Sequence, residues 1–162
     1  MQRLFLLCLT LCILGGCAMF AVSPNEPFDP AFAYVTGRTT FLGEKVEFRN
    51  LDDGDNIKLV IDRNKNYPLY KVSPGKYYAT EVSHGNFMYK VKMSPFQAEA
   101  GKINYIGDLS ITLHGRGIIL INPQNELVSA KAAIEQKYPA LAPSLDEIFV
   151  YSPLMRKIYT LD

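Results

Sequence analysis

The sequence has few of the side chains on which metal and nucleophile chemistry depend. Its 162 residues include two histidines, three cysteines and no tryptophan, whereas zinc sites and activated nucleophiles draw chiefly on His and Cys. It also lacks a basic excess, because 17 Lys and Arg face 16 Asp and Glu, so no positive field favours nucleic acid. Sequence motifs for phosphate loops, hydrolase elbows and zinc helices are absent. We therefore expect no nucleic-acid partner, no cofactor and no catalytic activity.

The apolar run at the amino end is too short to span a bilayer. Residues 4–14 follow the cationic Arg3 and stop at Gly15-Gly16, as in a secretory signal, whereas a spanning helix needs about 20 apolar residues. The end of this run and the residues after it, Leu14-Gly15-Gly16-Cys17, resemble the lipobox of bacterial lipoproteins. An ordinary secretory signal, cut after Ala18 or Ala21 with Cys17 incidental, is the other interpretation.

The lipobox resemblance implies cleavage before Cys17, which becomes the first mature residue. Its sulfur then carries a thioether-linked diacylglyceryl group and its amino group an acyl chain, and stable anchoring takes more than one chain. All three cysteines, Cys8, Cys12 and Cys17, fall in this region, so the mature domain has no disulfide. Ala18 follows the cysteine where an Asp suggests inner-membrane retention in enterobacterial lipoproteins. The resemblance thus implies the periplasmic face of the outer membrane.

We expect three parts: residues 1–16 as lipoprotein signal peptide, 17–31 as lipidated cysteine and tether, and 32–162 as one domain. Pro24, Pro27 and Pro30 recur every three residues, a spacing that favours an extended chain of about 3.1 Å per residue. Such a tether reaches about 40 Å from the bilayer. The alternative is an N-terminal arm that lies along the domain with Phe20 and Phe28 packed on it.

Beyond the tether, apolar residues alternate with period two between short turns, which predicts a mainly β domain. Short, evenly spaced strands predict an antiparallel β-sandwich of seven or eight strands. Gly37 is expected to separate two of them, and Phe87, Tyr89, Val91 and Met93 are expected to form the inward face of another. The stretches from which these seven or eight strands are expected lie at 32–36, 39–42, 45–49, 57–61, 69–72, 76–82, 87–93, 103–113 and 118–121, with a possible late strand at 148–151.

The period changes to that of a helix near the carboxyl end. Leu127, Ala130, Ile134 and Tyr138 recur at helical spacing, Asn125 is a capping residue, and Pro139 is a stop. The sequence predicts one amphipathic helix at about 126–138 that lies against the sandwich and shields an edge or an open end.

Two stretches, Ser73-Pro74-Gly75-Lys76-Tyr77-Tyr78 and Phe96 with residues 100–109, resemble periplasmic lipoproteins with a transthyretin-like, carboxypeptidase-regulatory-like sandwich. In that pattern a Pro-Gly turn launches a strand with an inward aromatic residue, and a Gly later opens a Tyr-bearing strand. The resemblance covers under a third of the chain. It implies fold and compartment, and it assigns no functional residue.

Three turn residues remain as candidate ligand contacts. His84 and His114 each precede a glycine, and Arg116 lies between two glycines. Exposed turn positions explain all three, and a zinc pair or an anion contact is the alternative. The ten tyrosines either fill the core or stack on a ligand. We predict a lipid-anchored envelope protein that acts as a structural or protein-interaction module, with membrane and envelope protein as its partners. A module that binds a small molecule or glycan is the alternative.

Overall fold

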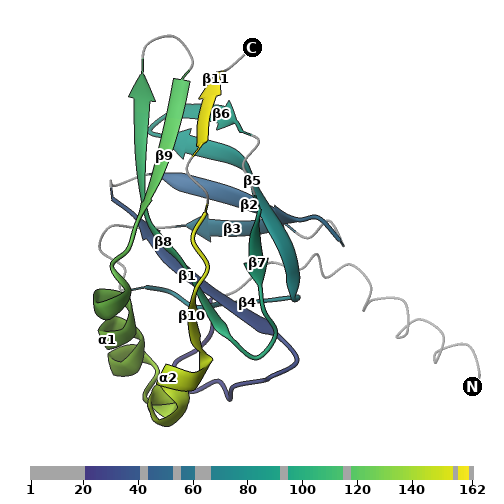
Figure 1. Ribbon diagram of the computed structural model, residues 1–162, viewed down its shortest axis with the longest axis vertical. Coiled ribbons are helices and arrows are strands. Elements are labelled where there is room, and N and C mark those ends of the chain that lie inside the picture. Colours follow the sequence, from purple (N-terminus) through teal and green to yellow (C-terminus); the bar gives the residue numbers. More distant parts are fainter. Residues whose placement is uncertain are drawn as a thin grey trace, which may run out of the picture.

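The protein is a mainly β structure with two sheets and two short α-helices (Figure 1). The computed structural model describes residues 21–40, 44–52, 56–60, 67–91, 95–114, 118–154 and 157–160. The signal peptide, Cys17, Arg116 and Met93 therefore lie outside the described residues.

The first sheet is built around its longest strand, β8 (Ile103–His114). The strand order is β11-β9-β8-β1-β4, and β10 also pairs with β8. Along one edge β8 is paired with β1 in parallel, and along its other edge it pairs first with β10 in parallel and then with β9 antiparallel. The other strands are β1 (Ala33–Thr39), β4 (Tyr70–Val72), β9 (Ile118–Gln124), β10 (Phe149–Tyr151) and β11 (Lys157–Thr160).

The second sheet is antiparallel throughout and is built around β5 (Gly75–His84). Its order is β3-β2-β5-β6, with β7 paired to the start of β5. The chain crosses from the first sheet to this one at Ser73-Pro74-Gly75, the turn predicted from the sequence, where Gly75 has φ +151°. The other strands are β2 (Lys45–Asn50), β3 (Asn56–Val60), β6 (Phe87–Lys90) and β7 (Phe96–Ala98).

One apolar core joins the two sheets. Val35 of β1 and Ile106 of β8 belong to the same buried cluster as Phe48 of β2 and Val82 of β5. Phe96 packs edge-on against Phe48, and its ring lies stacked with that of Tyr77. Burial of this apolar surface stabilises the packing of the two sheets.

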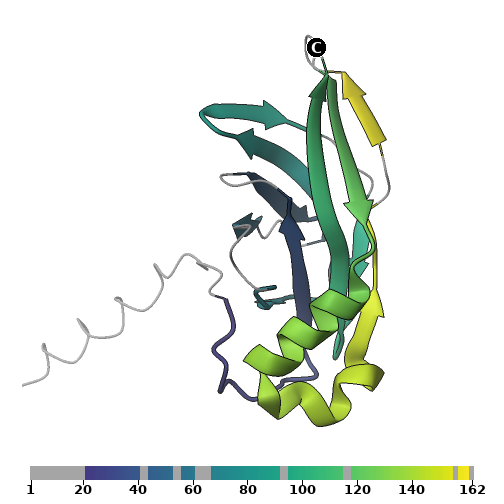
Figure 2. The same ribbon diagram turned by 90° about the vertical axis from the view of Figure 1, so that its left-hand side faces the viewer.

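A second apolar cluster covers the other face of the first sheet (Figure 2). Helix α1 (Leu127–Lys137), the 3₁₀ helix η1 (Pro139–Ser144) and α2 (Leu145–Ile148) follow β9 and lead into β10. The predicted helix is confirmed in its position and its apolar stripe, since Ala130, Ile134 and Tyr138 are buried. The helix begins one residue later than predicted, so its N-cap is Glu126, which forms no side-chain capping bond, and not Asn125. Asn125 Oδ1 instead accepts a hydrogen bond from the Leu127 amide at 3.2 Å.

The described part of the N-terminal segment lies on the body. Ala21 forms a β-bridge with Tyr70, and the Val22 amide donates to the Leu69 carbonyl at 2.8 Å. Further along, the ring of Phe28 stacks on Tyr34 with centroids 4.8 Å apart. Residues 21–31, expected as part of a tether, are thus an arm packed along the domain, which removes most of the predicted 40 Å reach.

Four further expectations need correction. The described residues form eleven strands, more than the seven or eight predicted, because the short strands β7 and β11 carry little periodicity. Two pairings of β8 are parallel, so the sheets are not wholly antiparallel. Gly37 lies inside the single strand β1 and separates nothing. Phe87, expected to face inward, is exposed.

Candidate functional site

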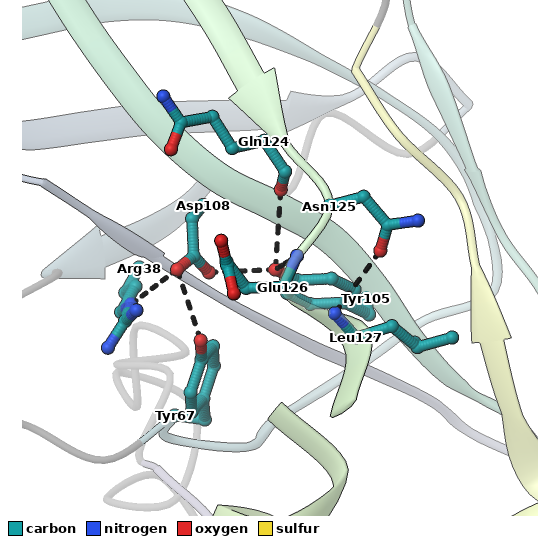
Figure 3. A network of polar contacts seen from close by, with 8 residues as sticks. All are labelled: Arg38, Tyr67, Tyr105, Asp108, Gln124, Asn125, Glu126 and Leu127. Atoms are coloured by element: carbon teal, nitrogen blue, oxygen red, sulfur yellow. Dashed lines mark hydrogen bonds and ion pairs between the residues drawn. The ribbon is translucent and has the colours of Figure 1, made fainter. Parts of the chain in front are cut away.

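A buried carboxylate, Asp108, is the centre of the most connected polar cluster among the described residues (Figure 3). Its side chain is 2% exposed. Asp108 Oδ2 accepts hydrogen bonds from Arg38 Nε at 2.5 Å and from the Tyr67 hydroxyl at 3.1 Å. Asp108 Oδ1 accepts one from the Tyr105 hydroxyl at 2.8 Å. Because a buried carboxylate must be compensated, these three donors make its burial possible.

A β-bulge places Asp108 on the same face as Tyr105. Thr36 pairs with Tyr105 and Arg38 pairs with Asp108, so an advance of two residues along β1 corresponds to an advance of three residues along β8. The extra residue reverses the alternation of β8: Ile103 and Tyr105 face the helices, whereas Leu109 and Ile111 face the other sheet. Asp108 consequently faces the helical side, where Arg38 reaches it from the neighbouring strand.

Two glycines permit this bulge. Gly107 has φ +97°, and a Cβ atom there would lie 3.0 Å from Pro123 Cβ. In β1, a Cβ atom on Gly37 would lie 2.8 Å from Ile106 Cγ1 and 2.9 Å from the Gly107 carbonyl oxygen. A side chain at either position would force the strands apart, so glycine is required by the close approach of the two backbones.

Tyr105 connects the carboxylate to the beginning of helix α1. Its hydroxyl donates a hydrogen bond to Asp108 and accepts one from the Glu126 amide at 3.1 Å. The same hydroxyl lies 3.4 Å from the Gln124 carbonyl oxygen. The Glu126 amide precedes the first helical turn, where backbone donors lack intrahelical partners. The cluster therefore ties β1, β8 and the start of α1 to one another.

Tyr67 completes the cluster from a loop that precedes β4. Its backbone has φ +28°, a conformation that residues with side chains rarely adopt. The guanidinium carbon of Arg38 lies 4.9 Å from the centre of the Tyr67 ring, a cation–π contact. Arg38 is 37% exposed, so the cluster has one charged group at the surface and its carboxylate inside.

The electrostatics of the cluster favour a neutral phenol on both tyrosines. Burial raises the pKa of Tyr67 above its ordinary value, and the negative charge of Asp108 adds to the effect. Burial and the hydrogen bond to Asp108 raise the pKa of Tyr105 in the same direction. For Arg38, burial lowers the pKa, but the hydrogen bond and charge of Asp108 outweigh it and the net pKa is raised. The cluster thus keeps its tyrosines protonated and its arginine charged.

This arrangement fits a structural role better than acid–base chemistry. Both carboxylate oxygens of Asp108 already accept hydrogen bonds from protein groups. The raised pKa values of Tyr67 and Tyr105 keep both phenols protonated. Across the described ranges, no three His, Cys, Asp or Glu side chains come together as a metal site would need.

Of the three turn residues predicted as candidate ligand contacts, Arg116 lies outside the described residues, and the two histidines end strands. His84 ends β5 in one sheet and His114 ends β8 in the other. Whether the side chains of these two histidines contact a ligand stays a prediction. Six of the ten tyrosines are buried, which supports the core interpretation: Tyr34, Tyr67, Tyr70, Tyr77, Tyr105 and Tyr138. Tyr77 is buried, while its neighbour Tyr78 in strand β5 is half-buried.

Sequence reasoning missed the Asp108 cluster. A partial signal is present, since Gly107 is the one glycine inside strand β8 and an isolated strand glycine indicates a bulge. The partners Arg38 and Tyr67 carry no comparable signal, because they lie 70 and 41 residues away in the chain.

Comparisons of the chain with protein-family models, with curated proteins and with solved structures found no match. Within the part of the chain that the structure describes, no helix has the length and apolar character needed to cross a bilayer.

Proposed function

We propose that the chain is a lipid-anchored protein of the bacterial envelope, held by Cys17 at the periplasmic face of the outer membrane. Its β body acts without catalysis as a structural or protein-interaction module. The observation that carries this proposal is the position of Cys17. It ends a lipobox-like sequence only four residues before Ala21, where the chain is already bonded to the folded body.

The hydrogen bonds that the Asp108 carboxylate makes within the protein support a non-enzymatic role. Asp108 has the burial expected of a catalytic acid or base, yet its three protein donors occupy both oxygens. General acid–base work needs a group that can reach a substrate proton. Asp108 is better placed to hold strand β8 and helix α1 together.

We also propose that the two sheets form a sandwich of the transthyretin-like kind. Support comes from the single apolar cluster that includes side chains of both sheets, among them Val35, Phe48 and Val82. Sheets that share one such core pack face to face about 10 Å apart.

The anchor is tested by membrane fractionation of cells that produce the full chain or a Cys17→Ala variant. Cys12→Ala, which changes a cysteine inside the expected signal peptide, is the matched control. We expect the unchanged chain and Cys12→Ala in the membrane fraction and Cys17→Ala outside it. Membrane association of Cys17→Ala equal to that of the control would contradict the lipid anchor.

The interaction role is tested by crosslinking in cells, followed by identification of the proteins attached to the mature domain. We expect a reproducible envelope protein, captured less when the domain is released by Cys17→Ala. Turnover of any substrate by the purified protein would contradict the non-catalytic role.

A further inference from the structure

The described residues carry an exposed apolar hairpin tip. Phe87 and Met88, which begin β6, are each 67% exposed. Consecutive strand residues point to opposite faces, so the tip extends beyond the packed core on both faces. Gly85 forms the turn with φ +58°, and a Cβ atom there would have no neighbour within 4 Å. The Phe87 ring lies 6.5 Å from that of Tyr89, which packs against the core. The tip is therefore an apolar projection on a firmly held base.

The chain length between Cys17 and the body limits how far the domain can stand from the lipid. Four peptide units separate Cys17 from Ala21, and at 3.3–3.6 Å each they span at most about 14 Å. Ala21 and Val22 are fixed to Tyr70 and Leu69. The intervening Ala18, Met19 and Phe20 are all apolar. An anchor of this length holds the adjoining side of the body against the bilayer surface.

The hairpin lies on that same side. In Figure 2 the hairpin β5–β6 lies at the upper left and the segment that begins at residue 21 lies at the lower left, both on the side away from β9. The carboxyl end of α1 adjoins that segment, since the Tyr138 hydroxyl donates to the Val22 carbonyl oxygen at 3.4 Å. The charge of the hairpin fits a lipid surface. Between Val82 and Ala98 the sequence has no acidic residue and two lysines, Lys90 and Lys92, and basic groups beside apolar ones favour anionic headgroups.

We infer that the tip of hairpin β5–β6 inserts Phe87 and Met88 into the headgroup and acyl boundary of the membrane that holds Cys17. This inference rests on the proposed lipid anchor. The hairpin makes a second contact with the bilayer, and together with the anchor it fixes the orientation of the domain. The occupant of this apolar surface is lipid, not the strand of a protein partner.

The test places one spin label on the acylated full-length protein, reconstituted in vesicles of phosphatidylethanolamine and phosphatidylglycerol. The label is attached at Met88→Cys or, as a matched control, at Val128→Cys, an 84% exposed apolar residue on α1. Collision rates with oxygen, which concentrates in the acyl region, and with a water-soluble nickel complex report the depth of each label.

We expect the ratio of oxygen to nickel collisions at position 88 to exceed that at position 128 several-fold. Equal, water-like ratios at both positions would overturn the inference. Spin–spin broadening at position 88 would overturn it too, because it would assign the hairpin to a second copy of the chain. The mass of the same sample reports acylation separately. An acylated protein with an aqueous label refutes hairpin insertion alone, whereas an unacylated protein refutes the proposed anchor.

Discussion

The substitution Asp108→Asn tests whether the buried carboxylate holds the first sheet and helix α1 together. Asparagine keeps the shape but offers one acceptor oxygen and an NH₂ group in place of two acceptor oxygens. Asp108 Oδ1 accepts the hydrogen bond from Tyr105, and Oδ2 accepts those from Arg38 and Tyr67. In either orientation of the amide, its NH₂ group faces at least one of these donors, and a buried donor loses its partner.

The expected magnitude follows from the number and kind of these bonds. A hydrogen bond to a charged group contributes about 1.5–3 kcal/mol, and removal of one partner of a buried ion pair costs about 3–5 kcal/mol. Solvent reaches Arg38, which is 37% exposed, and its ion pair is screened accordingly. We therefore expect a loss of about 3 kcal/mol in the free energy of unfolding. For a chain of this size that lowers Tm by about 6–12 °C.

The assay is urea and thermal unfolding followed by circular dichroism, with both proteins purified in the same form. Asp146→Asn is the matched control. Asp146 also forms an ion pair, with Lys131, but its side chain is 92% exposed, so its loss should leave Tm almost unchanged. A change of less than about 1 kcal/mol for Asp108→Asn would refute the reasoning, because the carboxylate would then contribute no more than an ordinary exposed hydrogen bond.

Three further predictions concern the bulge, the tyrosines and the helix. Gly107→Ala adds a Cβ atom 3.0 Å from Pro123 Cβ at φ +97° and should lower the unfolding free energy by about 2 kcal/mol in urea; an unchanged midpoint would contradict this. Burial and Asp108 raise the pKa of Tyr67 and Tyr105, so the folded state keeps protons that the unfolded state loses above pH 10. Stability should hold below about pH 10 and fall as the pH rises further, and urea midpoints at pH 9 and 11 that agree would contradict it. Ile134→Ala, at a fully buried position, should cost about 2–5 kcal/mol, whereas Val128→Ala should change the midpoint little.

Local patterns predicted much of the fold. Period two identified strands such as β2 and β3, and helical spacing identified α1 together with its buried residues. These features depend on neighbours within a few residues, which the sequence displays directly. The turn at Gly75 likewise follows from a Pro-Gly pair whose backbone conformation is local.

Long-range pairings were not accessible in the same way. The parallel alignment of β1 with β8 joins segments some 70 residues apart, and the Asp108 cluster exists only because of that alignment and its bulge. Gly37 illustrates the error that results. Read alone, it indicates a break between strands, whereas in the structure it allows Ile106 and the Gly107 backbone to approach. The N-terminal prolines favoured an extended tether, but burial of Val22 and the stacking of Phe28 place this segment on the body.

The lipid anchor on which the proposed function depends is tested most directly by the intact mass of the native protein purified from membranes. We expect the mass of residues 17–162 with one glyceryl group and three acyl chains, and fragments that carry all of the added mass on Cys17. An unacylated protein whose first residue lies elsewhere would contradict it.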